Sequence, residues 1–392
     1  MFFEYEKSIK SLDDIEYIKN DYFHITVSEW DLLKKAFTKE EIKAHISPII
    51  ESLPYPYFLY GDIELRKDFA KLKSKQTLFE YGEWVATRQA SQLDTTYLGK
   101  SIYLSCHYLG KKVSNNFTQE QRMKCSYRKI GNSPFDEWEN ASKNNSFLRC
   151  LFGIHEEDIY ERGGVNRSTL RRALTMHTYT ASQFKSEAAK AMYNLFNAKR
   201  VLDFSAGWGD RLVGFLASNA ESYIGIDPNT KLHEPYQQIV DFCNTNKETK
   251  FICSPAEDAD LSDVKVDFVF TSPPYFDIER YSDEDTQSWK RYPNVNLWVD
   301  KFLLPTISKC WDCLEDGGRI AINIADKKGV DICTPMLKHF ETLGATYEGV
   351  IGYRMSERGG QKTSNPSCEP IFIWSKGIIE EPKWDQSTYF GV

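Results

Sequence analysis

The stretch that decides the fold is Val201-Leu202-Asp203-Phe204-Ser205-Ala206-Gly207-Trp208-Gly209-Asp210. It reads as a short strand that runs into a Gly-x-Gly turn, and a helical pattern follows over residues 212–216. Glycines let the backbone approach a ligand closely at the start of that helix. The next predicted strand, residues 223–226, ends in Asp227, which is placed to accept hydrogen bonds from a ribose diol. This arrangement indicates a nucleoside-containing cofactor.

A second stretch, Thr271-Ser272-Pro273-Pro274-Tyr275-Phe276, follows the mostly apolar run of residues 266–270. The run predicts a buried strand that ends where two prolines cannot continue the ladder. The prolines supply no N–H, so their carbonyls stay free as acceptors on a stiff piece of chain. A hydroxyl, a carbonyl and an aromatic ring suit a flat ligand that carries an amino group. The alternative is an ordinary turn with a packed tyrosine.

Together the two stretches resemble the S-adenosylmethionine-dependent amino-methyltransferases of DNA, whose motifs are D-x-x-x-G-x-G and [DNS]-P-P-[YFW]. The segments QFKSEAAKAMY, VLDFSAGWGDRL, YIGIDPN and TSPPYFDIERYSDEDTQS look like those of DNA methylases common in phages, large viruses and some bacteria. The resemblance covers roughly residues 175–376. It implies an α/β, Rossmann-like class I methyltransferase fold with a seven-stranded, mostly parallel sheet whose last strand is antiparallel.

The resemblance also implies which residues hold S-adenosylmethionine. The candidates in the turn and at the next strand are Asp203, Ser205, Gly207, Gly209 and Asp227. The segment before the first strand closes over the methionine end of the cofactor, which makes Gln183 and Phe184 candidates, although core packing explains Phe184 equally well. At the third strand end, Asp258 is preferred to Glu257 as the acceptor for the adenine amino group. A solvated acidic turn is the alternative there.

For catalysis the resemblance implies the set Ser272, Pro273, Pro274 and Tyr275. An exocyclic amino nitrogen is a poor nucleophile, whereas a methyl group on a sulfonium is already activated, so we expect positioning and electrostatics to dominate, without a metal. Ser272 Oγ and the Pro273 carbonyl would accept the amino hydrogens while Tyr275 stacks on the base. In duplex DNA the base must first leave the stack.

Other residues are expected to contact the nucleic acid. Phe276 would help to hold the flipped base, and residues 277–296 are predicted to form a lid or substrate loop that includes Arg280. The loop after the sixth strand would bring Arg354 and Arg358 to phosphates.

The target base and polymer stay open. A serine before Pro-Pro-Tyr favours N4 of cytosine over N6 of adenine in the family, but the motif order here departs from the permuted enzymes that include many cytosine-N4 enzymes. An RNA base methyltransferase is a second reading, and a catalytically silent nucleic-acid-binding subunit is a third. The intact motifs argue against a silent subunit. The sequence identifies no partner subunit and no cognate nuclease.

Length and composition predict two domains. The 392 residues are 41% hydrophobic and 14% aromatic, which indicates a globular chain long enough for two domains. We expect a mainly helical domain over residues 1–160, and the resemblance implies a methyltransferase domain over 161–392. The first would serve target recognition or a partner surface, or act as a structural cap. Its predicted helices cover residues 12–18, 28–37 and 39–50, the last two capped by Ser28 and Thr38.

Charge and cysteine content bear on partners and location. The net charge of −7 is unusual for a DNA-binding protein, but basic residues gather in three clusters, at 66–75, 111–129 and 162–172. No apolar stretch approaches 18 residues, the first residues do not form a signal peptide, and the nine cysteines are scattered. We therefore expect a cytoplasmic protein with no membrane partner. Cys310 and Cys313 are predicted to be buried apolar residues rather than metal ligands.

Overall fold

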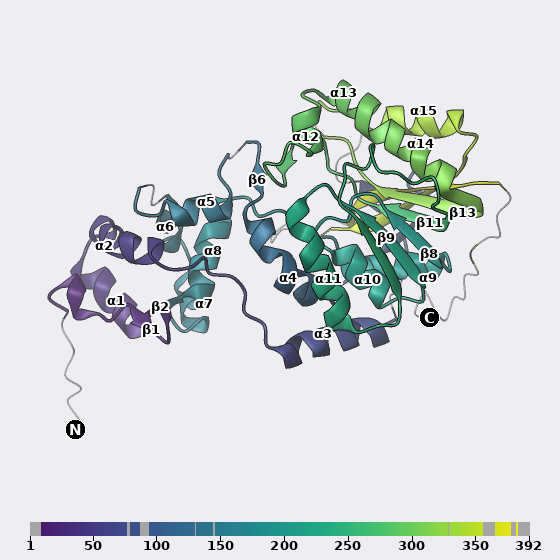
Figure 1. Cartoon of the computed structure of the whole chain (residues 1–392). Helices are drawn as coiled ribbons and strands as arrows, with labels where there is room; N and C mark the ends of the chain where they lie inside the picture. Colours follow the sequence, from purple (N-terminus) through teal and green to yellow (C-terminus); the bar gives the residue numbers. More distant parts are fainter. Residues whose placement is uncertain are drawn as a thin grey trace. The chain divides into compact units, whose positions relative to one another are not determined.

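The computed structural model describes residues 9–76, 79–86, 94–129, 131–143, 146–327, 329–355, 365–377 and 382. The chain divides into two compact units, each built from two segments (Figure 1). The first unit comprises Met1–Leu59 and Glu120–Ala181, and the second comprises Tyr60–Gln119 and Ser182–Val392. This division corrects the single boundary expected at residue 160.

Residues 60–119 belong to the second unit because they pack on its sheet and helices. The helix α3 (Asp62–Ser74) ends on Lys190, whose ammonium donates to the carbonyls of Leu72, Lys73 and Lys75 at 2.7, 2.9 and 2.8 Å. A buried lysine thus supplies the donors that the last turn of a helix lacks. Composition alone gives no sign of this long-range contact.

The second unit is built on a 10-stranded sheet in which seven strands run in the order β10-β9-β8-β11-β13-β15-β14. Their bounds are β8 (Arg200–Asp203), β9 (Ser222–Ile226), β10 (Glu248–Ile252), β11 (Val266–Thr271), β13 (Leu314–Asn323), β14 (Thr346–Arg354) and β15 (Ser367–Ser375). The first five strands in this order are parallel, and β15 is antiparallel to both of its neighbours. The predicted Rossmann-like class I methyltransferase fold with its antiparallel last strand is confirmed.

Three short strands extend this sheet beyond the prediction. They are β3 (Phe79–Tyr81), β4 (Val85–Ala86) and β5 (Ile102–Leu104). β5 continues the sheet from β14 and pairs with β3, whereas β4 pairs with β15. Strands of two or three residues carry too little alternation to be read from sequence.

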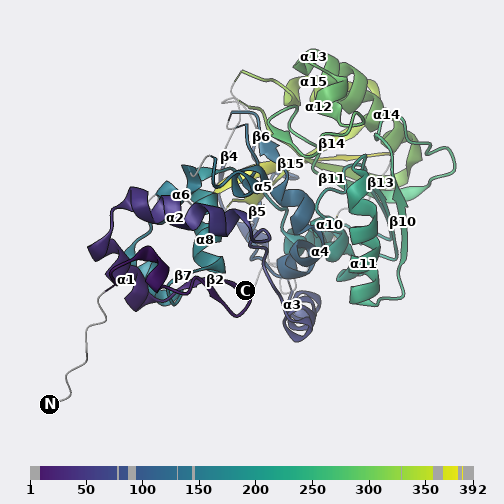
Figure 2. The same cartoon turned by 60° about the vertical axis from the view of Figure 1, so that its left-hand side comes forward.

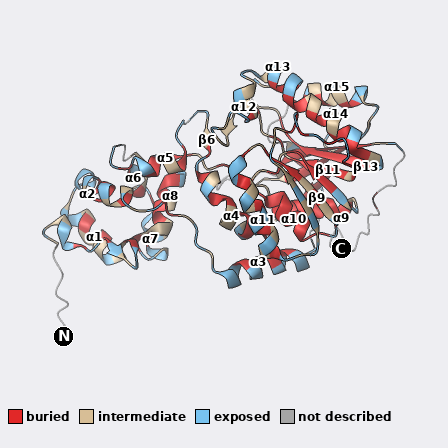
Figure 3. Ribbon diagram, viewed as in Figure 1, coloured by how far each residue is buried: buried red, intermediate tan, exposed pale blue. Residues whose placement is uncertain are grey.

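Helices cover both faces of the sheet, as Figures 1 and 2 show. On one face lie α3, α4 (Lys111–Met123), α9 (Ser186–Leu195), α10 (Asp210–Leu216) and α11 (His233–Cys243), and on the other lie α12 (Ser288–Arg291), α13 (Val295–Trp298), α14 (Leu304–Cys313) and α15 (Cys333–Thr342). Figure 3 shows the sheet strands as mostly buried. The short segments η2 (Thr230–Leu232) and β12 (Glu279–Arg280) complete the unit.

A π-helical turn, η3 (Val299–Leu303), lies between α13 and α14, next to Pro305. Pro305 has no N–H, so it cannot donate to the carbonyl one turn earlier. The N–H of Leu304 donates to the carbonyl of Val299, five residues back. The helix widens where the proline interrupts its bonding pattern.

The first unit is mainly helical, as predicted, around its own apolar core. It contains η1 (Leu12–Asp14), β1 (Ile18–Lys19), β2 (Tyr22–Ile25), α1 (Val27–Ala36), α2 (Lys39–Glu51), β6 (Ser126–Tyr127), α5 (Pro134–Glu139), α6 (Ser146–Leu151), α7 (Glu156–Glu161), β7 (Val165–Asn166) and α8 (Arg167–His177). The strands β1, β2 and β7 form a small sheet.

Two local predictions in this unit need correction, and one is confirmed. The helix expected over residues 12–18 is only one 3-10 turn followed by a strand. The helix expected to begin at Ser28 is capped by Thr26, which forms a capping box with Glu29. Glutamate reaches back to the cap better than Asp31 would, so the cap lies two residues earlier. The cap at Thr38 with Glu41 is as predicted.

Within the described part of the chain, no helix is long and apolar enough to span a membrane.

Candidate active site at the strand ends

The glycine turn, Asp227 and the Ser-Pro-Pro-Tyr segment lie at one edge of the sheet. Since β8, β9, β10, β11 and β13 are parallel, their carboxyl ends share that edge. In register, Leu202 of β8 faces Val269 of β11, and Thr271 of β11 faces Ile322 of β13. The glycine turn and the Ser-Pro-Pro-Tyr segment therefore leave neighbouring strands side by side, where open α/β sheets bind ligands.

The glycine turn needs its glycines. Gly207 and Gly209 have φ of 59° and 78°, a region that other residues adopt only at a cost. A Cβ on Gly209 would lie 2.8 Å from Ile239 Cδ1. The Tyr236 hydroxyl donates to the carbonyl of Gly207 and fixes the turn from α11. The turn is held in one shape, with Gly209 buried and Gly207 half-buried.

Asp203 anchors this turn from inside the protein. Its fully buried carboxylate accepts from Arg211 at 2.8 and 3.1 Å, from the Tyr223 hydroxyl at 2.7 Å and from the Thr271 hydroxyl at 2.8 Å. The Ser205 N–H also donates to it, at 3.2 Å. A carboxylate offers about four lone-pair positions, and these donors occupy them. Asp203 thus ties the glycine turn to the Ser-Pro-Pro-Tyr segment through Thr271.

Asp227, at the end of β9, faces the same turn. One of its carboxylate oxygens accepts the Gly207 N–H and the other the Asn229 N–H, both at 2.9 Å. Burial raises the pKa of Asp227 to about 6, although these two bonds favour the ionised form. The predicted contact with a ribose hydroxyl would add a further donor to this carboxylate.

At the end of β10 the structure favours Glu257 over the predicted Asp258. Asp258 is half-exposed and forms an ion pair with Arg291 at 2.8 Å. Glu257 is buried and accepts from Arg291 and from the Tyr292 hydroxyl through one oxygen. Its other oxygen is buried without a partner, and burial raises the pKa of Glu257. The carboxylate with an unused acceptor is therefore Glu257.

Gln183 and Phe184 have different surroundings. The Gln183 amide nitrogen lies 3.3 Å from both Ser114 Oγ and Asp210 Oδ1, whereas its oxygen is buried without a partner. Phe184 stacks on Tyr353 with ring centroids 4.7 Å apart. Core packing thus accounts for Phe184, while Gln183 retains an acceptor for a ligand.

Ser272 follows β11 and meets the last residue of β13. Its hydroxyl lies 3.3 Å from Asn323 Oδ1, and Asn323 Nδ2 donates to the carbonyl of Pro370 at 3.1 Å. Pro273 is buried and Pro274 is half-buried. Asn323 is 1% exposed, so its amide is fixed beside the predicted catalytic serine.

Tyr275 is held at two points. Its hydroxyl donates to Glu369 at 3.1 Å, and the Lys327 ammonium lies 3.9 Å from the centre of its ring. Glu369 lies near the start of β15, which begins at the carboxyl edge because it is antiparallel to β13. The ring is therefore fixed in position, with the Lys327 ammonium over one face.

Phe276 is buried, whereas the sequence prediction places it in contact with the base. It is 7% exposed and packs edge-on against Trp298 at 6.4 Å in the core. Its φ of 59° is unusual for an aromatic residue and turns the side chain inward directly after Tyr275. The prediction that Phe276 holds a flipped base is corrected, and the residue instead anchors the segment.

The segment after Phe276 lies against the end of β9. Glu284 accepts from the Thr230 N–H at 3.1 Å, and the Thr286 hydroxyl donates to the carbonyl of Pro228 at 3.3 Å. Tyr281 packs edge-on against Trp208 of the glycine turn at 5.7 Å. These contacts join the predicted lid to the loops on the cofactor side.

The three arginines predicted to contact nucleic acid are in different situations. The guanidinium of Arg280 lies 4.7 Å from the centre of the Trp289 ring. Arg354 is half-buried at the end of β14, where its carbonyl accepts from Lys185 at 2.8 Å. Arg358 lies outside the described residues.

Several polar atoms near these strand ends are buried without a hydrogen-bond partner: Gln183 Oε1, Asn229 Nδ2 and Glu257 Oε2. Such atoms are costly and uncommon, and they indicate a polar ligand. Together with the glycine turn and Asp227, they offer donors and acceptors along three adjacent strands. This set fits S-adenosylmethionine, which carries an amino acid, a ribose and an adenine.

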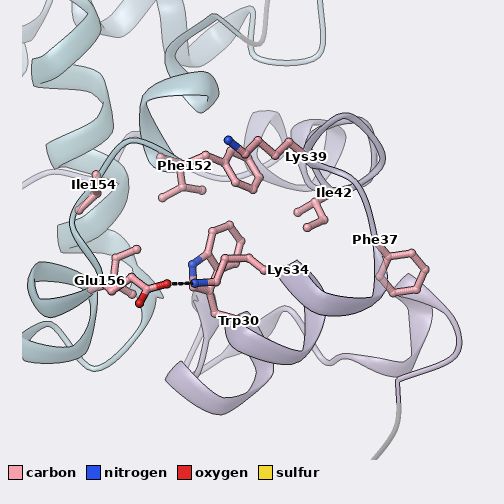
Figure 4. A pocket seen from close by; sticks show the side chains of 10 residues that line it. Trp30, Lys34, Phe37, Lys39, Ile42, Phe152, Ile154 and Glu156 are labelled. Atoms are coloured by element: carbon pink, nitrogen blue, oxygen red, sulfur yellow. Dashed lines mark hydrogen bonds and ion pairs between the residues drawn. The ribbon is translucent and has the colours of Figure 1, made fainter.

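The first unit has a cavity of its own, of about 170 Å³ (Figure 4). Its walls are mostly apolar, with Trp30 and Phe152 rings 5.2 Å apart. Lys34 forms ion pairs with Glu156 at 2.8 Å and with Asp31 at 3.2 Å. None of the lining side chains has a buried polar atom without a partner, so the cavity requires no polar ligand.

The basic clusters are largely engaged within the protein. Arg66 pairs with Asp62, Lys112 with Glu64, Lys124 with Glu120, and Arg162 with Asp158. Ion pairs of this kind reduce the positive charge available for phosphates, and the clusters supply no independent argument for nucleic acid.

Cys310 and Cys313 are buried, as predicted. Among the described residues, no group of three or more His, Cys, Asp or Glu side chains is arranged to hold a metal ion.

The chain is similar in fold to several methyltransferases of known structure. These include a SAM-dependent O-methyltransferase from Thermotoga maritima, at 12% identity over 53% of this chain and 71% of that chain with a TM-score of 0.35. TrmN from Thermus thermophilus has 15% identity over 49% of each chain and a TM-score of 0.35, so the match spans about half of TrmN. An rRNA methylase from Streptococcus thermophilus has 16% identity over 47% of this chain and 92% of that chain, with a TM-score of 0.31.

No family model and no curated protein sequence matches the chain. The fold assignment rests on the strand order of the sheet itself.

Sequence reasoning missed Asn323, Glu369 and Arg211. Asn323 could have been noticed as the one amide in the apolar run of residues 320–325. Glu369 gives no such signal, because its partner Tyr275 lies 94 positions away in the sequence. Arg211 lies only eight positions after Asp203, but nothing in the sequence pattern singles it out.

Proposed function

We propose that this chain transfers a methyl group from S-adenosylmethionine to the exocyclic amino group of a base in DNA. The observation that carries the proposal is the hydrogen bond of 2.8 Å between Thr271 and Asp203. It joins the Ser-Pro-Pro-Tyr segment to the glycine turn at the shared edge of the sheet. A site for a nucleoside cofactor and a site for a planar amino compound are thereby adjacent.

In this proposal some residues bind the cofactor and others position the amino group of the base. Asp227 accepts from the ribose, and Gln183 Oε1 accepts from the ammonium of the amino-acid end. Glu257, rather than Asp258, accepts from the adenine amino group. When bound, S-adenosylmethionine supplies an electrophilic methyl group on a sulfonium.

The catalytic segment prepares the amino nitrogen. Ser272 Oγ and the Pro273 carbonyl accept its hydrogens, which draws the nitrogen lone pair out of conjugation with the ring. Tyr275, fixed by Glu369 and Lys327, supplies a face on which the base stacks after it leaves the helix. In-line placement of the nitrogen lowers the barrier further.

The Ser-Pro-Pro-Tyr motif favours N4 of cytosine over N6 of adenine, and its resemblance to DNA methylases favours DNA over RNA. In this proposal the first unit serves target recognition or a partner surface.

The test is incubation of the purified protein with radiolabelled S-adenosylmethionine and mixed-sequence duplex DNA or RNA, followed by nucleoside mass spectrometry. We expect methylcytosine or methyladenine in DNA, and a loss of about 10- to 100-fold in Tyr275→Ala, since stacking contributes ~1–3 kcal/mol. Tyr347→Ala, which removes a tyrosine that is 43% exposed in the same unit, should keep full activity.

Other outcomes separate the alternatives. Label in RNA alone would contradict a DNA substrate and retain base methylation. Tight binding of S-adenosylhomocysteine without label in either polymer would support the silent binding subunit.

A further inference from the structure

We propose that Asn323 makes Ser272 a hydrogen-bond acceptor and so selects bases that carry an amino group over bases that carry an oxygen at that position. The inference rests on the proposed function and names a positioning residue for it.

The orientation of the Asn323 amide is determined by its neighbour in β15. The carbonyl of Pro370 can only accept, and Asn323 Nδ2 lies 3.1 Å from it. The amide nitrogen must therefore face Pro370, and the amide oxygen faces Ser272. Asn323 is 1% exposed at the end of a sheet strand, so rotation of the amide would bury two facing oxygens without a hydrogen bond between them.

The fixed amide dictates the role of the serine. Asn323 Oδ1 has no hydrogen to give, so across 3.3 Å the Ser272 hydroxyl donates and the amide oxygen accepts. A hydroxyl has one hydrogen and two lone pairs. With its hydrogen committed, Ser272 presents only lone pairs to a substrate.

This arrangement predicts a chemical preference. An amino group donates to Ser272 Oγ and to the Pro273 carbonyl, whereas an oxygen at the same position meets two acceptors. Sites that hydrogen-bond a substrate group reject analogues that cannot complete the bond, because buried groups are left unpaired. Cytosine and adenine would be accepted, and uracil and hypoxanthine, their oxo counterparts, would be rejected.

The experiment measures binding of fluorescent oligo(dC) and oligo(dU), and of oligo(dA) and oligo(dI), in the presence of S-adenosylhomocysteine. The two polymers of a pair carry the same phosphates, so the backbone contribution cancels in the ratio of their dissociation constants. We expect wild type to prefer the amino polymer of at least one pair by about tenfold or more.

Asn323→Leu removes the amide at similar volume and frees the Ser272 hydroxyl to donate, so the ratio should fall close to one. Asn323→Asp keeps an acceptor oxygen towards Ser272 and should retain the preference, although its second oxygen faces the Pro370 carbonyl and should lower stability. The matched control is Asn166→Ala in the first unit, where Asn166 likewise bonds a carbonyl through Nδ2, at 2.6 Å from Arg162 O, and accepts the Ser168 N–H. It should lower stability and leave the ratio unchanged.

Two results would overturn the proposal: a preference that survives in Asn323→Leu, or one that survives in Ser272→Ala. The half-buried Ser272 tolerates truncation, so its variant gives an answer even where Asn323→Leu does not fold. Label transfer by a wild type without amino preference would overturn the role of Asn323 and leave the methyltransferase proposal standing. A wild type that binds neither polymer and transfers no label would overturn both.

Discussion

The strand ends of the second unit and the cavity of the first unit differ in whether their buried polar atoms have partners. Around the strand ends, Gln183, Asn229 and Glu257 keep buried atoms without partners. Around the cavity, the ammonium of Lys34 is satisfied by Glu156 and Asp31, and the remaining walls are mostly apolar. Buried polar groups are costly when unpaired, so the first arrangement anticipates a polar ligand and the second is imperfect packing.

The largest expected difference in the free energy of unfolding between variants of the two regions comes from breaking the buried ion pair of Asp203 and Arg211. Their side chains are 0% and 5% exposed, so Asp203→Ala leaves a buried cation without its partner and should lower the free energy of unfolding by about 3–5 kcal/mol. Glu156→Ala breaks the ion pair at the cavity, where the Glu156 side chain is 67% exposed, and should cost at most about 1 kcal/mol. Urea denaturation followed by tryptophan fluorescence measures both, and equal losses would contradict the distinction.

The next largest effects are expected from substituting two glycines with positive φ, one in each unit. Gly209→Ala combines backbone strain at φ 78° with a Cβ only 2.8 Å from Ile239, so we expect a loss of about 2 kcal/mol and at least about tenfold weaker binding of S-adenosylhomocysteine. Gly163→Ala, at φ 74° with no atom within 4 Å, should cost about 1 kcal/mol and leave binding unchanged. Calorimetric titration of both variants gives the comparison. Unchanged binding by Gly209→Ala would remove the turn from the cofactor site.

These two regions also show what the sequence could predict. Individual strands could be predicted from apolar runs that lead to Asp203, Asp227 and Ser272, and the parallel sheet that collects their ends at one edge was implied by the family resemblance. The division of each unit into two segments could not be predicted, because the contacts of Lys190 with α3 join residues more than a hundred positions apart. Glu257 and Asp258 are adjacent in sequence and both pair with Arg291, and only their burial, 5% against 53% side-chain exposure, distinguishes their surroundings.

A smaller, pH-dependent effect should come from Asp227. Ribose hydroxyls bind the ionised carboxylate better, so with a pKa of about 6 affinity for S-adenosylhomocysteine should fall below pH 6, by at most about tenfold per pH unit. In the ligand-free protein the sign is opposite: the raised pKa stabilises the fold below pH 4, and this contribution is lost as the pH rises through 6. Asp227→Asn should bind more weakly and with a flat profile between pH 5 and 7. A profile that stays steep in the variant would assign the titration to another group.

The smallest effect is expected when the cavity of the first unit is filled. Ile154, which is 6% exposed, lines a volume of about 170 Å³, so Ile154→Phe adds carbon atoms where space exists and should change the free energy of unfolding by less than about 1 kcal/mol. Methyl transfer and S-adenosylhomocysteine affinity should stay at wild-type levels, since no side chain that lines the cavity has a buried polar atom without a hydrogen-bond partner. Thermal unfolding and the label-transfer assay check the two halves of this expectation. A variant that folds normally and loses transfer would show that the cavity takes part in substrate binding, and the contrast between the two regions would then fail.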